Sequence, residues 1–367
     1  MSNTFGTILR LTTFGESHGI AVGGVLDGFP AGIEIDTDYV SRRLALRRPG
    51  RSQLTSARNE ADEPQFLSGI FEGKSLGTPI GFIIPNKDAR SSDYDDMRHK
   101  FRPSHADFAY TAKYGIRDHR GGGRSSARET VCRVVAGALC SLPLSRLGIT
   151  VTAFLSGVSD LRIPYHELAL AAERSETVDS SPLFCPFPEY EKEFGRRISE
   201  AAGRGDSVGG TVTVAVSGVP AGLGEPLYGK LSSMIASAAM SIGAVKGIEF
   251  GLGFGLTSLN GSEANDRFAA DGSFRLATNF GGGIEGGISH GGEILFTVAF
   301  KPTPSISLPQ QTIDAEGEPA ELRIKGRHDP CVALRGVQVV RAMTEITLLD
   351  AWLLARATAP LAYESLV

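Results

Sequence analysis

The chain has 367 residues, 41% hydrophobic and 21% charged, which is the composition of a globular protein with a large core. A formal net charge of −4 and a pI near 6.0 argue against a general nucleic-acid binder, and no apolar run is long enough to cross a membrane. Four cysteines without CxxC or metal-site spacing, and a start without a signal-peptide pattern, predict a cytoplasmic protein with reduced thiols and no metal.

Short runs rich in β-branched residues, bounded by Gly, Pro or Asn, predict strands along most of the chain. These runs are AVGGVLDG (21–28), PIGFIIPN (79–86), ITVTAFLSGV (149–158), GGTVTVAVSGV (209–219) and GEILFTVAF (292–300). Fewer segments predict helices. One is the apolar face of Val131, Val134, Val135, Ala138 and Leu139, and the others are residues 228–247 and 335–357.

A helix followed by strands occurs twice, around 129–160 and around 228–300, which predicts a duplicated α+β unit. The charged segment 161–206 is interpreted as a surface connector. No boundary is sharp enough to divide the chain, so we expect a single domain over residues 1–367.

The stretch GGGRSSARET combines a glycine turn with arginines in an otherwise acidic chain. Ser126 and Glu129 have the spacing of a capping box, which predicts that a helix begins there. The free N–H groups of such a helix start favour anions. Residues 98–133 hold nine lysines and arginines against three acidic residues. A solvated basic face is the alternative, but the coincidence with a glycine turn favours an anion site.

A second basic cluster, Arg42 to Arg51, contains Arg47 and Arg48 just before Pro49–Gly50.

Two nucleotide-binding patterns are rejected. GGGIEGG (281–287) precedes a strand where a dinucleotide fingerprint requires a helix, and GIFEGKS (69–75) is one residue short of a Walker A motif. The glycine run remains a place where backbone can touch a ligand.

Two of the seven histidines lie in turn-like motifs, His18 in FGESHG and His105 in FRPSHAD. With an ordinary pKa of about 6.5, either side chain can transfer a proton near neutral pH. The residues alone thus predict an enzyme that acts on a polyanionic small molecule, without defining the reaction.

Several longer blocks together resemble chorismate synthase, in that family's order and over nearly the whole chain. They are GESHGIAVGGVLDGFP, FRPSHADFAYTAKYGIRDHRGGGRSSARET, SGVPAGLGEP, SIGAVKGIEFGLGF, KPTPSIS and KGRHDPCVALRG. The resemblance implies an α+β duplication with central helices between sheets, assembled as a homotetramer. It also implies an anti-1,4-elimination of phosphate and the C6 hydrogen from 5-enolpyruvylshikimate 3-phosphate, with reduced FMN as a cofactor that is not consumed.

The resemblance also carries site residues onto this chain. Those implied to contact FMN are Arg124, Ser125, Ser126, Gly243, Ala244, Gly286, Lys301, Pro302, Thr303, Pro304, Ser305 and Arg327. Those implied for the substrate or NADP are Ser17, Arg47, Arg102 and Arg128, with Arg327 shared. His18 is implied as the general acid near the leaving phosphate, His105 as the proton donor to the flavin, and Asp329 as a neighbour of the flavin N5.

NADPH, used indirectly, is the implied source of electrons, and the sequence leaves open whether a separate flavin reductase or this chain itself reduces the flavin. This chain departs from the usual family pattern at Gln53, Phe280, Gln338 and Arg341. A flavin-dependent oxidoreductase acting on a phosphorylated acid, and a non-catalytic anion-binding protein, remain the alternatives.

Overall fold

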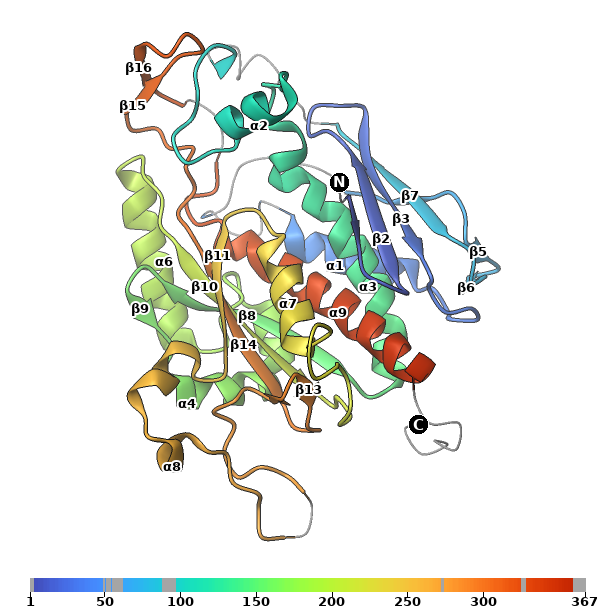
Figure 1. Ribbon diagram of the computed structural model, residues 1–367. Helices are drawn as coiled ribbons and strands as arrows, with labels where there is room; N and C mark the ends of the chain where they lie inside the picture. Colours follow the sequence, from blue (N-terminus) through green and yellow to red (C-terminus); the bar gives the residue numbers. More distant parts are fainter. Residues whose placement is uncertain are drawn as a thin grey trace.

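In the computed structural model, which describes residues 3–48, 50, 54, 62–87, 97–271, 274–324 and 328–358, two antiparallel sheets enclose a layer of helices (Figure 1). The first sheet has the order β1 (Thr4–Phe5), β2 (Arg10–Gly15), β3 (Ala21–Asp27), β7 (Ile80–Pro85) and β4 (Gln65–Phe66). The second has the order β11 (Val245–Phe250), β14 (Ile294–Phe300), β10 (Gly210–Ser217), β8 (Thr150–Val158) and β9 (Leu161–Arg162). The expected α+β fold with central helices is confirmed.

The remaining strands form small hairpins: β5 (Ile70–Phe71) with β6 (Lys74–Ser75), β12 (Ile284–Glu285) with β13 (Ile288–Ser289), and β15 (Gln310–Ile313) with β16 (Pro319–Leu322). The α-helices are α1 (Thr37–Arg47), α2 (Asp107–Tyr114), α3 (Thr130–Arg146), α4 (Tyr165–Leu168), α5 (Ser175–Ser180), α6 (Pro188–Gly203), α7 (Leu231–Met240), α8 (Gly261–Ala264) and α9 (Ala333–Thr358). Short 3₁₀ turns lie at Gly123–Ser125, Ala127–Glu129, Ala169–Arg174 and Gly253–Ser258.

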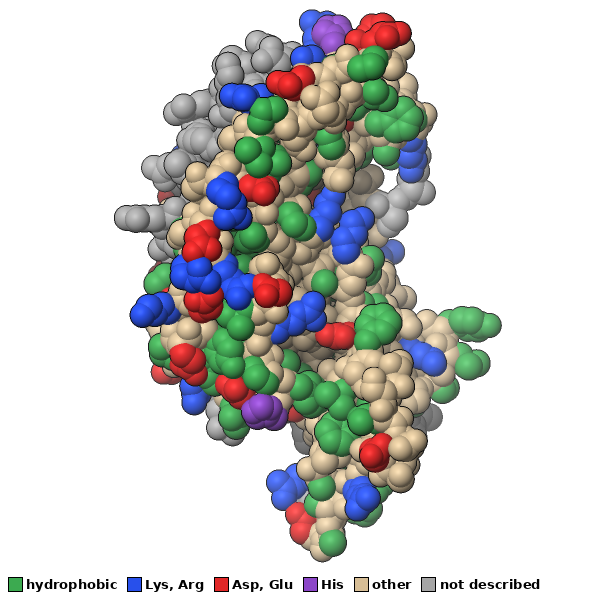
Figure 2. Space-filling view, turned by 90° about the vertical axis from the view of Figure 1, so that its left-hand side faces the viewer, with side chains coloured by type: hydrophobic (Ala, Val, Ile, Leu, Met, Phe, Trp, Pro, Cys, Tyr) green, Lys and Arg blue, Asp and Glu red, His purple; other side chains and the backbone are tan. Residues whose placement is uncertain are grey.

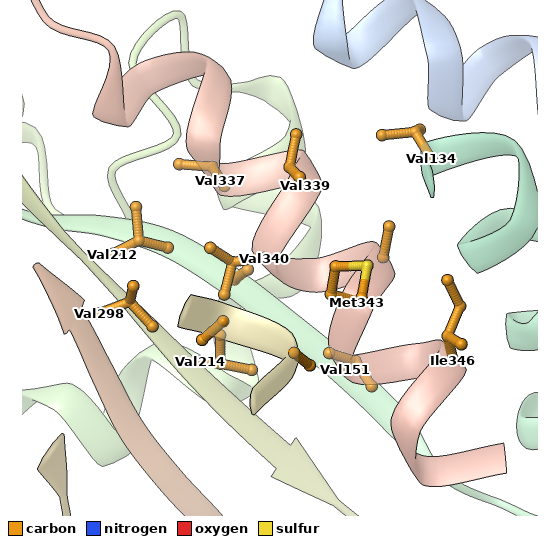
Figure 3. Packing of buried hydrophobic residues seen from close by; sticks show 14 of the residues in the cluster. Val134, Val151, Val212, Val214, Val298, Val337, Val339, Val340, Met343 and Ile346 are labelled. Carbon is orange, nitrogen blue, oxygen red and sulfur yellow. The ribbon is translucent and has the colours of Figure 1, made fainter. Parts of the chain in front are cut away.

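Helices α3 and α9 pack against each other at the centre, with α3 against β2 and β3 and α9 against β8 and β10. Figure 3 shows Val340 of α9 facing Val212 and Val298 of the second sheet. The two helices approach closely at Gly137, where a Cβ atom would lie 2.4 Å from the Cα atom of Ala342. Only glycine allows this approach, which keeps the core densely packed.

Every residue of β8 after its first is buried, and so is every residue of β10 before its last. The cause is that α9 covers one side of this sheet while α5 and α6 contact β8 as well. Segment 161–206 contains β9, α4, α5 and α6, and Phe194 and Ile198 of α6 are fully buried. Burial on both sides explains why these strands read as continuous apolar runs.

Helix α9 carries buried polar side chains that join it to other parts of the chain. The carboxylate of Asp350 accepts hydrogen bonds from the backbone N–H groups of residues 7, 8 and 9, at 2.8, 2.9 and 2.9 Å. Arg341, one of the departures from the family pattern, pairs with Asp179 of α5 and with Glu345. The side-chain amide of Gln338, another departure, is buried and has no hydrogen-bond partner among the described residues. Arg341 therefore links α9 to the 161–206 segment.

One sequence prediction is wrong in detail, because the capping box does not form. The Ser126 side chain accepts from the N–H of Arg128 and begins only a 3₁₀ turn, and the α-helix starts at Thr130. Glu129 does not reach back to Ser126; it pairs with Arg133 at 2.9 Å. The Glu129 carboxylate that the capping box required is thus used in the ion pair with Arg133, one helical turn further along the chain. The predicted strands at 21–28, 79–86, 149–158, 209–219 and 292–300 and the helix at 335–357 are present with slightly different ends. The helix predicted at 228–247 is only half as long, because α7 spans Leu231–Met240 and the residues from Val245 onward belong to strand β11.

No helix in the described part of the chain is both long and apolar enough to span a membrane.

Candidate active site

A cavity of about 810 Å³ opens beside the central helices. Its lining comes from distant segments: strands β1 and β2, the 102–106 turn, the glycine turn and the start of α3, α7 with the turn after it, residues 300–301 and 303–305, and the start of α9. The residues that the family resemblance assigned to the site and that line this cavity are Arg102, His105, Arg124, Ser125, Ser126, Gly243, Ala244, Lys301, Thr303, Pro304, Ser305 and Asp329. The fold therefore brings together most of the residues that the resemblance assigned.

Positive charge is concentrated in this cavity. Six lysine and arginine side chains line it against the carboxylates of Glu129 and Asp329. By contrast, the molecular face around α6 mixes both signs, with blue and red side chains interspersed (Figure 2). Ion pairs such as Arg196–Glu193 account for this mixture. The chain is acidic overall, so a local cationic excess in a concave site indicates an anionic ligand.

The glycine turn separates the two candidate histidines. A Cβ atom at Gly121 would lie 2.5 Å from Cδ2 and 2.6 Å from Nε2 of His18, and one at Gly122 would lie 3.2 Å from Cε1 of His105. Both glycines have positive φ, +65° and +87°. The turn thus needs glycine for its backbone conformation and also for the space that the two rings occupy.

His105 is largely buried and its Nδ1 lies 2.9 Å from a carboxylate oxygen of Asp107. Burial lowers the pKa of His105, and the charges of Arg102 and Lys301 act in the same direction, against the raising effect of Asp107. The ring is therefore biased toward the neutral form when the cavity holds no anion.

Arg47 and Arg128 are buried but do not line the cavity. Both pair with the buried carboxylate of Asp62, Arg47 at 3.1 Å, and Arg128 also donates to the side chain of Asn86. Arg47 further donates to the carbonyl oxygen of Ala127, a residue of the cavity wall. Burial, with repulsion from Arg335 and Arg128, lowers the pKa of Arg47 to about 9 despite the attraction of Asp62. These two arginines lie behind the wall of the cavity.

Arg124 lines the cavity but uses part of its guanidinium group to hold the first sheet. It donates to the carbonyl and hydroxyl oxygens of Thr13 in β2, at 3.1 and 2.7 Å. The hydroxyl of Ser125 donates to the carbonyl of Gly122 at 2.7 Å and closes the glycine turn. The residues implied to contact the flavin thus also stabilise the turn that displays them.

Lys301 and Ala244 connect the end of the second sheet to the cavity. The ammonium group of Lys301 donates to the carbonyl of Ser104 at 2.5 Å, and its backbone N–H donates to the carbonyl of Ala244 at 2.9 Å. Both Ala244 and Ser104 have positive φ, +71° and +55°. Non-glycine residues in this conformation are strained, and such strain concentrates at functional sites.

Sequence reasoning missed several side chains of this region. Arg335 lines the cavity, donates to the Asp329 carboxylate at 3.1 Å, and has a buried Nε without a hydrogen-bond partner among the described residues. The others are Asp62, Asp107 and Lys246, whereas the lining residue Arg133 was already counted in the basic stretch 98–133. Asp107 and Lys246 lie inside motifs already quoted, so a search for ionisable neighbours of the assigned residues could have found them. Asp62 carried no comparable signal.

Some expected residues are not on the cavity lining. His18 and Ser17 lie against Gly121, at its edge, and the buried hydroxyl of Ser17 has no hydrogen-bond partner among the described residues. Gly286 is exposed on the β12–β13 hairpin, and Pro302 is an exposed neighbour of the lining residues. Arg327 and Gln53 lie outside the described residues. Among the described residues, no group of three or more His, Cys, Asp or Glu side chains could hold a metal ion.

Comparison with protein families gives one match over nearly the whole chain. A family described as chorismate synthase matches residues 9–353. Curated proteins named chorismate synthase include one from Porphyromonas gingivalis, 53% identical over 357 residues, or 96% of each chain. Another, from Phocaeicola vulgatus, is 51% identical over 359 residues, covering 98% of this chain and 99% of its own length.

A solved structure agrees with these matches. A crystal structure of chorismate synthase superposes with a TM-score of 0.75 at 30% sequence identity, over 95% of this chain and 92% of that chain. The likeness therefore covers the two sheets, the central helices and the cavity segments together.

Proposed function

Because this chain belongs to the chorismate synthase family, we propose that its cavity holds reduced FMN and 5-enolpyruvylshikimate 3-phosphate at the same time. The enzyme is a carbon–oxygen lyase. It removes phosphate from C3 and hydrogen from C6 of that substrate in an anti-1,4-elimination and yields chorismate, in the last common step toward the aromatic amino acids. The observation that carries the proposal is one cavity that combines six cationic side chains, a glycine turn and a buried histidine.

Charge supports the binding of two ligands. A phosphate monoester carries about 1.5–2 negative charges near neutral pH. FMN has one such group, and the substrate has another together with two carboxylates. A site for both must therefore offset roughly five negative charges, which needs several cations at short range. The cavity volume of about 810 Å³ lies toward the upper end of the roughly 300–1,000 Å³ that is usual for ligand pockets.

The residues present fit FMN. The cavity offers hydroxyl groups from Ser125, Thr303 and Ser305, two lysines from neighbouring segments, and open backbone at Gly243. We assign Arg124, Ser125, Ser126, Gly243, Ala244, Lys301, Thr303, Pro304 and Ser305 to the cofactor, with Pro302, Gly286 and Arg327 as further family positions. When bound, reduced FMN supplies an electron-rich ring that assists breakage of the weakly acidic C6–H bond.

The residues assigned to the substrate form two groups, one in direct contact with the ligand and one behind the cavity wall. We assign Arg102 and the edge residue Ser17 to direct contact with an anion; the assignment is supported by the position of Arg102 on the cavity lining and by the buried Ser17 hydroxyl, which has no partner among the described residues. Arg47 and Arg128 add positive charge from behind the wall at Ala127 and Thr130. In this proposal they raise the potential that attracts the substrate phosphate and carboxylates.

The histidines supply the proton transfers. Anionic ligands favour the imidazolium form, so their arrival raises the pKa of His105, and the ring takes up a proton at Nε2. His18, on the other side of Gly121, is assigned as general acid for the departing phosphate. Asp329, oriented by Arg335, is assigned to the C6 side of the reaction.

We further propose a homotetramer in the cytoplasm, with electrons supplied from NADPH by a separate flavin reductase. Four buried cysteines without disulfides support a reducing compartment. The exposed position of Gly286, away from the cavity, is consistent with a role that a neighbouring chain completes.

One assay tests the function. Phosphate release from the substrate is measured with chemically reduced FMN under anaerobic conditions, with and without NADPH, and the flavin spectrum is recorded during turnover. We expect phosphate and chorismate in equal amounts, an unchanged flavin redox state and no dependence on NADPH, with oxidised FMN as the inactive control. Oxidation of one flavin per product would instead support an oxidoreductase. Ligand binding without phosphate release would support an anion-binding protein.

A further inference from the structure

Asp107 is a buried carboxylate to which no role was assigned from the sequence. It is the first residue of α2 and its side chain is 3% exposed. It accepts from Nε and Nη2 of Arg102, each at 2.7 Å, and from the backbone N–H of Arg102 at 3.1 Å. Two parallel guanidinium bonds of this kind fix the plane of an arginine as well as its charge.

The same carboxylate contacts two further side chains. One oxygen lies 2.9 Å from Nδ1 of His105 and 3.1 Å from Nη1 of Arg117. Arg117 in turn donates to the carbonyls of Met97 and Lys100, at 2.6 and 3.1 Å. Asp107 thus connects a cavity arginine, a cavity histidine and the segment before them.

The protonation state of Asp107 decides what His105 must do. The hydrogen bonds from Arg102 and His105 hold the pKa of Asp107 well below its usual range, although burial alone would raise it. An ionised carboxylate only accepts hydrogen bonds, so Nδ1 of His105 must carry the proton of that contact. In the neutral ring, Nε2 is then the bare nitrogen.

The bare nitrogen is the one toward the glycine turn. A Cβ atom at Gly122 would lie 3.5 Å from Nε2 of His105, and His105 lines the cavity together with the neighbouring Gly121. The charged groups that act on this ring are Asp107, Arg102 and Lys301, with Arg117 on the far side of the carboxylate. Of these, only the negative charge of Asp107 favours a protonated ring.

We propose that Asp107 is a positioning residue of the reaction: it holds His105 as the Nδ1–H tautomer with Nε2 available to the cavity, and it aligns the guanidinium group of Arg102 beside that ring. The inference rests on the proposed function for its kinetic consequences only. The tautomer follows from the contacts and can be measured without turnover.

The first test uses the wild-type protein. Its histidines are labelled with ¹⁵N, and the His105 signals are identified by their loss in His105→Gln. We expect the neutral His105 ring to show the Nδ1–H tautomer, and the Asp107→Ala variant to lose it. A wild-type His105 in the Nε2–H form overturns the proposal, whether or not the variants fold and whatever reaction the enzyme performs.

The second test is the pH dependence of kcat with reduced FMN and the substrate. Asparagine keeps one oxygen that can accept from Nδ1 but removes the negative charge, so in Asp107→Asn the ionisation of His105 should move to lower pH. We expect kcat to fall on the order of 10²–10⁴-fold, the range for a positioned acid or base, because the asparagine amide can also donate to Nδ1 and favour the other tautomer. Asp118→Asn, which removes a carboxylate paired with the exposed Arg120, is the matched control and should leave the profile unchanged.

An Asp107→Asn enzyme with an unshifted pH profile, or with a change in KM alone, contradicts the proposal. If the wild-type enzyme releases no phosphate, the proposed function fails, while the tautomer measurement still decides the role of Asp107.

Discussion

Replacing Gly121 with alanine tests whether the glycine turn places His18. The added Cβ atom would lie 2.5 Å from Cδ2 and 2.6 Å from Nε2 of the ring, and 2.9 Å from the hydroxyl oxygen of Ser17. Carbon atoms in contact normally lie about 3.5–4.0 Å apart, so the ring must move by roughly 1 Å or the turn must open.

The expected loss has two separable parts. At φ +65°, alanine strains the backbone by about 1–2 kcal/mol, which lowers the free energy of unfolding. A displacement of a catalytic group by ~1 Å costs on the order of 10²-fold in rate. We therefore expect Gly121→Ala to remain folded but to lose about 10²-fold in kcat.

Gly148→Ala is the matched control. Gly148 has φ +75°, and no atom lies within 4 Å of its added Cβ, so this variant has the strain without the collision. Urea unfolding measures stability, and phosphate release with reduced FMN measures turnover. If both variants lose the same stability and Gly121→Ala keeps the turnover of Gly148→Ala, the placement of His18 by this turn is refuted.

Asp62→Asn removes the negative charge shared by two buried arginines, so we expect the unfolding free energy to fall by about 3–5 kcal/mol. Added phosphate, an anion, should restore part of this loss. Calorimetry at several phosphate concentrations measures both effects, and an unchanged unfolding midpoint in the variant would contradict the expectation. Asp350→Asn weakens a carboxylate that accepts three backbone N–H groups, so urea unfolding should show a loss of roughly 1.5–3 kcal/mol. The pKa of His105 is lowered in the folded protein, so the unfolded chain binds a proton first as the pH falls through about 6.5. The unfolding free energy should therefore decline toward acid pH, and His105→Gln should flatten this decline. Parallel curves of unfolding free energy against pH for the wild type and the variant would exclude this contribution of His105. Finally, the cationic excess of the cavity predicts that bound substrate raises the affinity for FMN about 5–150-fold. Calorimetric titration of FMN with and without substrate measures this factor. Equal affinities would indicate that the two sites are independent.

The strands and main helices were predictable because their signals are local. Alternating β-branched residues between turn formers identify 149–158 and 209–219, and an apolar periodicity identifies the helix from Thr130. The start of that helix was predicted three residues early, with Ser126 instead of Glu129 as the capping residue, since the local capping pattern competes with an ion pair between Glu129 and Arg133. Local rules describe the element, and tertiary contacts decide its ends.

The candidate site was predictable only in part. Motifs placed His105 and the glycine turn together, but no pattern in the sequence indicates that Asp62 pairs with both Arg47 and Arg128. That arrangement depends on a contact with Arg128, 66 residues away in the chain, and it moves two expected substrate arginines behind the cavity wall. A count of basic residues estimates the charge of a site, but it cannot tell which charges face the ligand.

The contact between Asp350 and the backbone of residues 7–9 joins segments more than 340 positions apart, which has a consequence for synthesis on the ribosome. At ~5–20 residues per second, roughly 20–70 seconds separate the emergence of these partners. The apolar side of β8 and β10 stays without its covering helix for about half of that time or less, because these strands end at residues 158 and 217 and α9 begins only at residue 333. The nascent protein is thus an extended target for chaperones, and its fold closes only once translation has passed α9.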